Sequence, residues 1–206
     1  MITIVNYGVG NIASLANMFD HVGADTHLSG DPDVIARARH LVLPGVGAFG
    51  HAMAVLNAGG LSDAIRTAVD RGAVLLGVCL GMQLLARSSE EGGAEGLGLI
   101  AADVRRIVPS LPGVKVPNMG WRDVEYVRDT WMAPSGAASE RFYFAHSYHM
   151  VCDREADIAA VVDYDGQKTI AVAHGAVHGV QFHPEKSHSF GMRLLADFAR
   201  LEHVPA

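Results

Sequence analysis

A cysteine between two glycines is the first group in the chain whose type and setting could support chemistry. Cys79 lies in Gly77-Val78-Cys79-Leu80-Gly81, which follows an apolar run of strand character and precedes a helical pattern. This is the form of a nucleophile elbow, with Cys79 in the place of a hydrolase serine. The two glycines permit a sharp turn that exposes the sulfur, and a helix beginning behind Cys79 favours the thiolate. Alone, the pattern leaves open a buried, inert thiol.

A histidine and a glutamate two residues apart could activate that thiol. In the stretch Gly179-Val180-Gln181-Phe182-His183-Pro184-Glu185, His183 and Glu185 point to the same side if the segment is extended. A carboxylate then holds the imidazole in one tautomer, as a base for a thiol nucleophile requires. By themselves the two residues fit a surface turn better. Together with the elbow they predict a catalytic triad of Cys79, His183 and Glu185.

A glycine-rich loop could supply the oxyanion donors that acyl transfer requires. Pro44-Gly45-Val46-Gly47 follows an apolar strand, and its glycines let backbone N–H groups approach a developing negative charge. Gly45, Gly47 and Gly50 also match G-x-G-x-x-G, the dinucleotide-binding fingerprint. Dinucleotide binding is disfavoured, because Pro44 precedes the glycines, the loop does not follow the first strand of the chain, and no clear acidic residue closes a neighbouring strand.

Composition restricts the class of protein. The 206 residues are 50% apolar and 18% charged, which fits a large core or a permanent partner surface, and the net charge of -6 argues against nucleic acid as the main ligand. Two cysteines suit a reducing cytosol, and the absence of a leader or a membrane-length apolar run favours a cytoplasmic protein. The eleven histidines lack the spacing of a metal site. We expect one domain over residues 1–206, with no metal and no cofactor.

The first half of the chain alternates strands and helices. Strands are expected at 2–6, 26–28, 40–43 (halted at Pro44) and 74–78, and helices at 11–22, 33–38 and 52–69 with a break at Gly59-Gly60. This alternation predicts an α/β fold with an open, mainly parallel sheet flanked by helices. The loops after Val5, Leu43 and Val78 should then converge at one edge of the sheet, where ligands bind in such folds.

The second half changes to short β-type segments separated by turns. They are expected at 103–107, 123–127, 141–145, 158–164, 169–174 and 177–182, followed by a helix at about 190–201. Asp165-Gly166 is a hairpin signal between two of these segments. The C-terminal half should therefore add antiparallel strands to the parallel sheet.

With these pieces in place, the chain resembles the class I, or triad-type, glutamine amidotransferases. Residues 77–83 are similar to the family's nucleophile motif, and His183-Pro184-Glu185 to its His-x-Glu pair. The resemblance covers nearly the whole chain and implies a flavodoxin-like fold. More narrowly, the chain resembles the glutaminase subunits of imidazole glycerol phosphate synthases in residues 6–11, 44–49, 115–121, 143–148 and 184–187.

The resemblance implies hydrolysis of L-glutamine through a thioester on Cys79. The ammonia would pass to a (β/α)8-barrel cyclase partner in histidine biosynthesis, with no nucleic acid or membrane involved. The residues that it implicates in the oxyanion hole and in glutamine binding are Val46, Gly47, Leu80, Gln83, Ser147 and Tyr148. The residues that it places toward the partner are Asn11, Trp121 and Lys186.

Three positions depart from the family's usual residues. Asn118 replaces a more common histidine, Arg122 a more common asparagine, and His149 a common aromatic residue. None belongs to the predicted triad, so they leave glutaminase chemistry intact and leave the ammonia acceptor open. One alternative is a paralogue that feeds a sugar-aminating enzyme of surface-polysaccharide synthesis. An alternative of another class is a non-catalytic regulatory module with the same fold, which would not need Cys79, His183 and Glu185 together.

Overall fold

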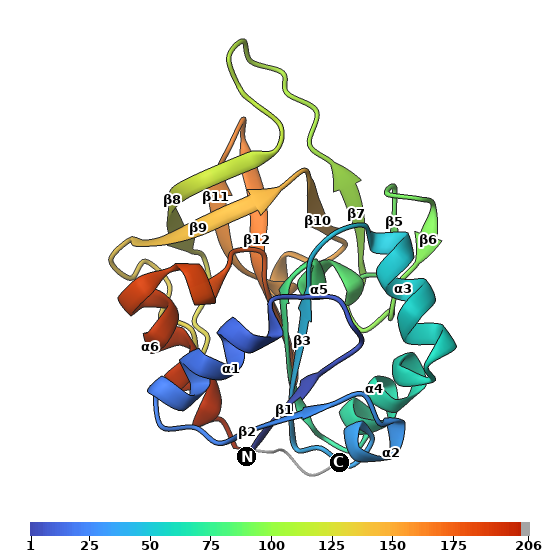
Figure 1. The fold of residues 1–206 in the computed structure, drawn as a ribbon. Coiled ribbons are helices and arrows are strands. Elements are labelled where there is room, and N and C mark those ends of the chain that lie inside the picture. The colour runs from blue at the N-terminus through green and yellow to red at the C-terminus, as the bar shows by residue number, and fades with distance from the viewer. Residues whose placement is uncertain (203–206) are drawn as a thin grey trace.

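Parallel strands form the centre of the computed structural model, which describes residues 1–202 (Figure 1). Their order across the sheet is β2 (Thr26–Ser29), β1 (Ile2–Val5), β3 (His40–Gly45), β4 (Val74–Cys79) and β13 (Val177–Val180). Strand β13 lies about a hundred residues after β4 in the chain, yet the two pair in parallel, with Val180 opposite Val78. This pairing brings the segment that follows β13 to the end of β4, where Cys79 lies.

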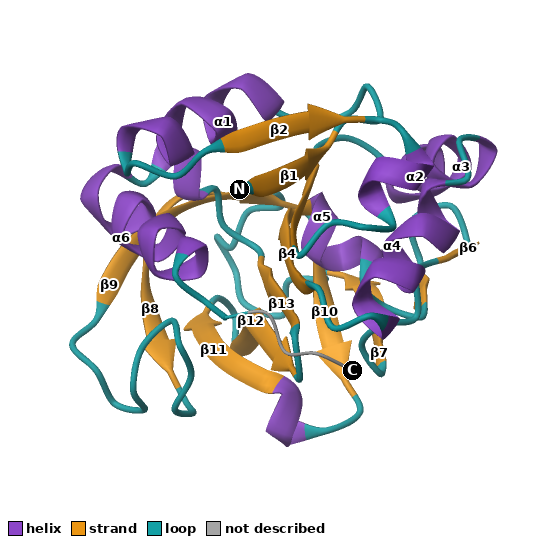
Figure 2. Ribbon diagram, turned by 90° about the horizontal axis from the view of Figure 1, so that it is seen from below, coloured by secondary structure: helices purple, strands orange, loops and turns teal. Residues whose placement is uncertain are grey.

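Helices cover both faces of this parallel sheet (Figure 2). Helices α1 (Ile12–His21) and α6 (His188–Ala199) pack on one face, and α2 (Pro32–Ile35), α3 (Phe49–Ala58), α4 (Leu61–Asp70) and α5 (Leu80–Leu84) on the other. Every residue of β1, β4 and β13 is consequently buried. Burial on both faces explains why these strands are almost entirely apolar in sequence.

A mainly antiparallel extension continues the sheet beyond β13. It runs through β12 (Gln167–His174), β10 (Tyr148–Cys152), β7 (Ala102–Arg106), β5 (Ser88–Ser89) and β6 (Ala94–Glu95). A branch leaves β12 through β11 (Ile158–Asp163) to β8 (Asn118–Tyr126) and β9 (Glu140–His146). Two short 3-10 helices complete the described elements, η1 (Glu155–Asp157) and η2 (Pro184–Lys186). The predicted α/β class with added antiparallel strands is confirmed.

Several predicted element boundaries are wrong, each for a physical reason. Strand β3 does not halt at Pro44 but continues to Gly45, which pairs with Cys79. The missing N–H of Pro44 is tolerated because it would lie on the β1 side of β3, where the pairing with β1 has already ended at Val42. On that side the carbonyl of Pro44 accepts a hydrogen bond from the hydroxyl of Tyr7 at 2.8 Å. Strand β13 ends at Val180 rather than at residue 182.

Further differences concern short or mixed segments. The strand predicted at 123–127 begins at Asn118, and the helix predicted at 33–38 is the single turn α2. Strands β5, β6 and β10 were not predicted, because the first two have two residues each and β10 mixes polar and apolar residues without a clear alternation. Within residues 1–202, no helix is long and apolar enough to cross a membrane.

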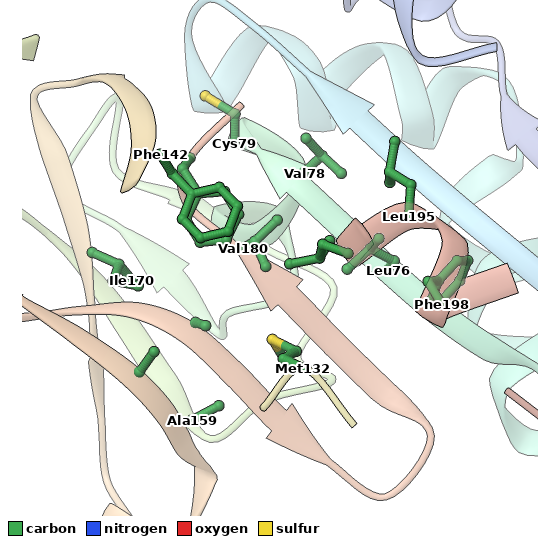
Figure 3. Close-up of a cluster of buried hydrophobic side chains, with 14 of the residues drawn as sticks. Leu76, Val78, Cys79, Met132, Phe142, Ala159, Ile170, Val180, Leu195 and Phe198 are labelled. Atoms are coloured by element: carbon green, nitrogen blue, oxygen red, sulfur yellow. The ribbon is translucent and has the colours of Figure 1, made fainter. Parts of the chain in front are cut away.

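The turn from β4 into α5 packs closely against the backbone of β3. Cys79 itself takes a left-handed φ of 56°, so the strain of the turn lies on the cysteine and not on the glycines beside it. The glycines are needed for close approach instead. A Cβ on Gly81 would overlap the carbonyl oxygen of Leu43, and one on Gly77 would lie 2.6 Å from the carbonyl oxygen of Gly81. Figure 3 shows Cys79 above Val78, at the edge of the buried cluster.

Gly81→Ala should therefore destabilise the fold. We expect a loss of about 3 kcal/mol or more in the free energy of unfolding, because backbone and not a flexible side chain must move to admit the methyl group. The matched control is Gly50→Ala in α3, whose added Cβ would meet its nearest neighbour at 3.7 Å. Urea unfolding should place the control within about 1 kcal/mol of the wild type. Equal stabilities for the two variants would contradict this account of the turn.

Candidate active site

A pocket of about 400 Å³ opens where β3 and β4 end and the segment after β13 begins. Cys79 and His183 both line it. The residues expected to form the oxyanion hole and to bind glutamine also line it, and these are Val46, Gly47, Leu80, Gln83, Ser147 and Tyr148. The structure thus gathers residues from distant parts of the chain at the edge where the parallel strands end.

His183 and Glu185 meet, but not in an extended segment as predicted. Glu185 lies in the 3-10 turn η2, and this turn brings its Oε1 within 2.9 Å of His183 Nδ1. Both side chains are at most 5% exposed. The backbone of His183 is fixed as well, because its N–H donates to the carbonyl of Tyr143 at 2.9 Å and its carbonyl accepts from the Ser187 hydroxyl at 2.6 Å.

The protonation of His183 follows from its neighbours. Burial alone would lower the pKa of the imidazole, but Cys79 on one side and Glu185 on the other outweigh it and raise the pKa from 6.5 to about 9. The ring therefore carries a proton at neutral pH, with the carboxylate of Glu185 on Nδ1. Such an imidazolium can stabilise a thiolate and give a proton to a leaving group.

Two buried glutamines connect the thiol to the far wall of the pocket. The carboxamide nitrogen of Gln83 donates to the carbonyl of Tyr148 at 3.1 Å and to Oε1 of Gln181 at 2.8 Å. The carboxamide nitrogen of Gln181 lies 3.9 Å from the sulfur of Cys79, within reach of a sulfur acceptor. Because both N–H bonds of Gln83 are used, its carbonyl oxygen is the atom left to accept a hydrogen bond from a ligand.

The loop after β3 lines the same pocket as Cys79. Val46 and Gly47 are exposed at the pocket, and Gly47 has a left-handed φ of 89° that favours glycine. Leu80 follows Cys79 directly and begins α5. Two residues after Gly47, the N–H of Phe49 is already bonded, since it donates to Oε2 of Glu91 at 2.8 Å.

The sequence reasoning missed three polar residues around the pocket. Glu91 and the buried His146 line it, and Gln181 is a buried polar residue that is bonded to Gln83 beside it. A signal existed for Gln181, the one polar residue in the apolar run 180–182. Glu91 lies in a charged, glycine-rich loop with no recognisable pattern, and only the fold brings it to the pocket.

The three predicted partner-facing residues do not all lie together. Lys186 lines the pocket, and its Nζ lies 5.6 Å from the centre of the Tyr143 ring. Trp121 packs edge-on against the same ring at 6.2 Å and stacks on His188 at 5.4 Å. Both residues therefore lie near the ring of Tyr143, and of the two only Lys186 lines the pocket. Asn11 precedes α1 and is not among the residues that line the pocket.

Two of the three departures from the family pattern lie close together behind the pocket. Asn118 is fully buried and bonded to Arg122 and His146. His149 is partly buried, and burial lowers its pKa.

In the part of the chain that the structure describes, no three histidine, cysteine or acidic side chains are grouped so as to hold a metal ion.

Known proteins share the sequence pattern of nearly the whole chain. Residues 3–201 match the family model described as glutamine amidotransferase class-I. The chain belongs to the class I glutamine amidotransferases. It is similar to an imidazole glycerol phosphate synthase subunit HisH 2 of Methanococcus maripaludis, with 41% identity over 97% of this chain and 99% of the relative. It is also similar to a HisH subunit of Bdellovibrio bacteriovorus, with 43% identity over 98% of this chain and 100% of the relative.

Solved structures support the fold of this amidotransferase. A crystal structure of a glutamine amidotransferase matches with a TM-score of 0.73 at 21% identity, over 98% of this chain and 100% of that one. A chain in the structure of PurLQS from Thermotoga maritima matches with a TM-score of 0.73 at 18% identity, over 96% of this chain and 94% of that one. At these identities the likeness concerns the fold alone.

The raised pKa of His183 can be measured by NMR titration. We expect a pKa of about 9 for His183 and about 4 for the buried His146. Glu185→Gln should lower the pKa of His183, because the carboxylate that favours its charged form is gone. The matched control, Glu125→Gln at an exposed position of β8, should leave it unchanged.

The same shift predicts the direction of a stability effect. A histidine whose folded-state pKa exceeds its unfolded value of 6.5 contributes stability that is complete below pH 6.5 and is lost as the pH rises through about 9. Unfolding of the wild type should therefore become easier across this window, and the Glu185→Gln variant should show a smaller change. A His183 pKa near or below 6.5 in the wild type would contradict the description of the site.

Proposed function

We propose that this amidotransferase is the glutaminase subunit of an imidazole glycerol phosphate synthase. It hydrolyses L-glutamine to glutamate and ammonia, and the ammonia is used by a cyclase partner that forms imidazole glycerol phosphate and an aminoimidazole carboxamide ribotide in histidine biosynthesis. One observation carries the proposal: Cys79 and the buried His183–Glu185 pair meet at a pocket that Gln83 also lines. The names and full-length coverage of the HisH relatives support the pathway.

In the first half of the reaction, the thiolate of Cys79 attacks the side-chain carbonyl carbon of glutamine. The carbonyl oxygen becomes an oxyanion, and backbone N–H groups at Leu80 and in the Val46–Gly47 loop stabilise it. When the tetrahedral adduct collapses, the C–N bond breaks and the imidazolium of His183 gives its proton to the departing nitrogen. Ammonia leaves, and the glutamyl group remains on sulfur as a thioester.

In the second half, water attacks the thioester carbonyl. His183, now neutral, takes one proton from the water, and Glu185 keeps the ring in position through Nδ1. The C–S bond then breaks and releases glutamate. Cys79 returns to the thiolate and His183 to the imidazolium, so the pair is restored for the next turnover.

The amino-acid end of glutamine is held on the opposite wall of the pocket. The free carbonyl oxygen of Gln83 and the carboxylate of Glu91 are acceptors suited to an α-ammonium group. The backbone of Ser147 and Tyr148 lies beside them for the α-carboxylate. Glutamine is thereby recognised at one end by polar groups and presents its amide to Cys79 at the other.

The ammonia acceptor in this proposal is a (β/α)8-barrel cyclase subunit. It docks over the pocket mouth at Lys186 and contacts Trp121, which packs against the same Tyr143 ring, and Asn11 before α1. Docking there would cover the pocket mouth and keep ammonia from bulk water. Residues 1–206 then act as one amidotransferase domain of a cytoplasmic heterodimer, with L-glutamine as the substrate and no cofactor.

Replacing the two cysteines separately tests the proposal. Cys79→Ala should reduce glutamine-dependent product formation by at least about a thousandfold in the complex with the cyclase, because the nucleophile is lost. Added ammonium salt should still support the cyclase reaction. The matched control is Cys152→Ala, which removes the other free thiol and should leave both activities unchanged.

Two results would overturn the proposal. Glutamine-dependent turnover that survives Cys79→Ala would exclude Cys79 as the nucleophile. Copurification of the chain with a sugar-aminating enzyme in place of a barrel cyclase would retain the glutaminase chemistry and reject the histidine pathway.

A further inference from the structure

A line of hydrogen-bonded polar side chains runs behind the pocket from β8 to β9. Arg122 Nε donates to Oδ1 of Asn118 at 3.1 Å, and Asn118 Nδ2 lies 3.0 Å from Nε2 of His146. His146 Nδ1 lies 2.7 Å from the carbonyl oxygen of Tyr148, which lines the pocket. Arg122 thus reaches the pocket wall through two buried side chains.

The chemistry of each member fixes the role of the next. Burial lowers the pKa of His146 to about 4, so its ring is neutral at pH 7 and has one N–H and one lone pair. The carbonyl of Tyr148 can only accept, so the ring proton is on Nδ1 and Nε2 must accept from the amide of Asn118. That orientation turns Oδ1 of Asn118 toward Arg122, which can only donate.

Arg122 is itself held in place from a second side. Its guanidinium lies 4.8 Å from the centre of the Tyr164 ring, in the geometry of a cation–π contact. The hydroxyl of Tyr164 donates in turn to the carbonyl of Lys115. A guanidinium stays charged at any ordinary pH, so the donor at this end of the line is permanent.

At its other end the line joins the glutamine-binding wall. The Tyr148 carbonyl that accepts from His146 also accepts from Gln83, whose second N–H is bonded to Gln181. If His146 no longer donated to the Tyr148 carbonyl, this carbonyl would be less firmly fixed. The amide of Gln83, which donates to the same carbonyl, could then turn over. The oxygen of Gln83 would then no longer face the ligand.

We propose that Arg122 is a positioning residue for glutamine, acting through Asn118 and His146 on the Tyr148 carbonyl and Gln83. It contacts neither the substrate nor the reacting atoms. It fixes the orientation of the Asn118 amide, and with it the hydrogen bond that this amide donates to Nε2 of His146, so that the wall of the pocket is already arranged when glutamine arrives. The inference rests on the proposed glutaminase function and assigns a role in binding to a residue outside the predicted triad.

Steady-state kinetics of glutamate formation in the complex with the cyclase test this role. Arg122→Met should raise the KM for glutamine about tenfold and leave kcat within about twofold, because one hydrogen bond to a charged group is lost behind the pocket and the triad is untouched. Asn118→Leu should have a similar or larger effect on KM. The double variant should be no worse than Asn118→Leu alone, because both substitutions break one line.

The matched control is Arg141→Met on the neighbouring strand β9. Arg141 is an exposed arginine bonded to Asp123 at 3.1 Å, so its loss should leave KM unchanged. Arg122→Lys should restore KM to within about threefold of the wild type, since an ammonium can still donate to Oδ1 of Asn118.

Nitrogen NMR of His146 gives a readout that a purely structural role would not change. The wild type should show the neutral Nδ1–H tautomer with Nε2 accepting a hydrogen bond. Arg122→Met should keep this tautomer, because the Tyr148 carbonyl still accepts from Nδ1, but should shift the Nε2 resonance toward that of a nitrogen with no donor, because the amide of Asn118 can then turn over. An unchanged KM in Arg122→Met would overturn the proposal, as would parallel losses of kcat and thermal stability with the Nε2 resonance of His146 unaltered. If the wild type itself forms no glutamate, the proposed function fails first, and that outcome is visible before any variant is measured.

Discussion

The close approach of the β4–α5 turn to β3 is the constraint on which the candidate site depends. Gly81 lies against the backbone of Leu43 with no room for a side chain, and Cys79 takes a left-handed backbone conformation to complete the turn. This geometry points the sulfur to the open edge of the sheet, places the N–H of Leu80 beside it, and starts the helix that carries Gln83. A shift of this turn would move all of them together.

The parallel pairing of β13 with β4 brings the other two members of the predicted triad to the β4–α5 turn. It carries Gln181 and His183 to Cys79 from the far end of the chain, and the 3-10 turn that follows brings Glu185 onto the imidazole. The electrostatic consequence is a histidine that stays protonated near neutrality although it is buried. Sheet topology thus sets the charge state of the site, because it decides which side chains surround the ring.

Sequence patterns predicted the elements that are determined by local turn residues or by apolar runs. The buried parallel strands, the helices around them and the elbow at Cys79 could be predicted from the sequence, as could Cys79, Gln83 and His183 among the residues that line the pocket. The 3-10 turn at Glu185, the continuation of β3 through Pro44 and the role of Glu91 could not, because each depends on a tertiary neighbour. The hydrogen-bonded line from Arg122 to Tyr148 could not be predicted for the same reason, because it depends on Asn118 and His146, which are 28 residues apart in the sequence.

The central claim is that Cys79 carries the glutamyl group during turnover. Rapid quenching of the complex in acid during turnover of isotopically labelled glutamine, followed by peptide mapping with mass spectrometry, tests it directly. We expect a glutamyl thioester on the peptide that contains Cys79, formed and lost at rates that match glutamate release. A label on Cys152, or turnover with no label on any cysteine, would contradict the account.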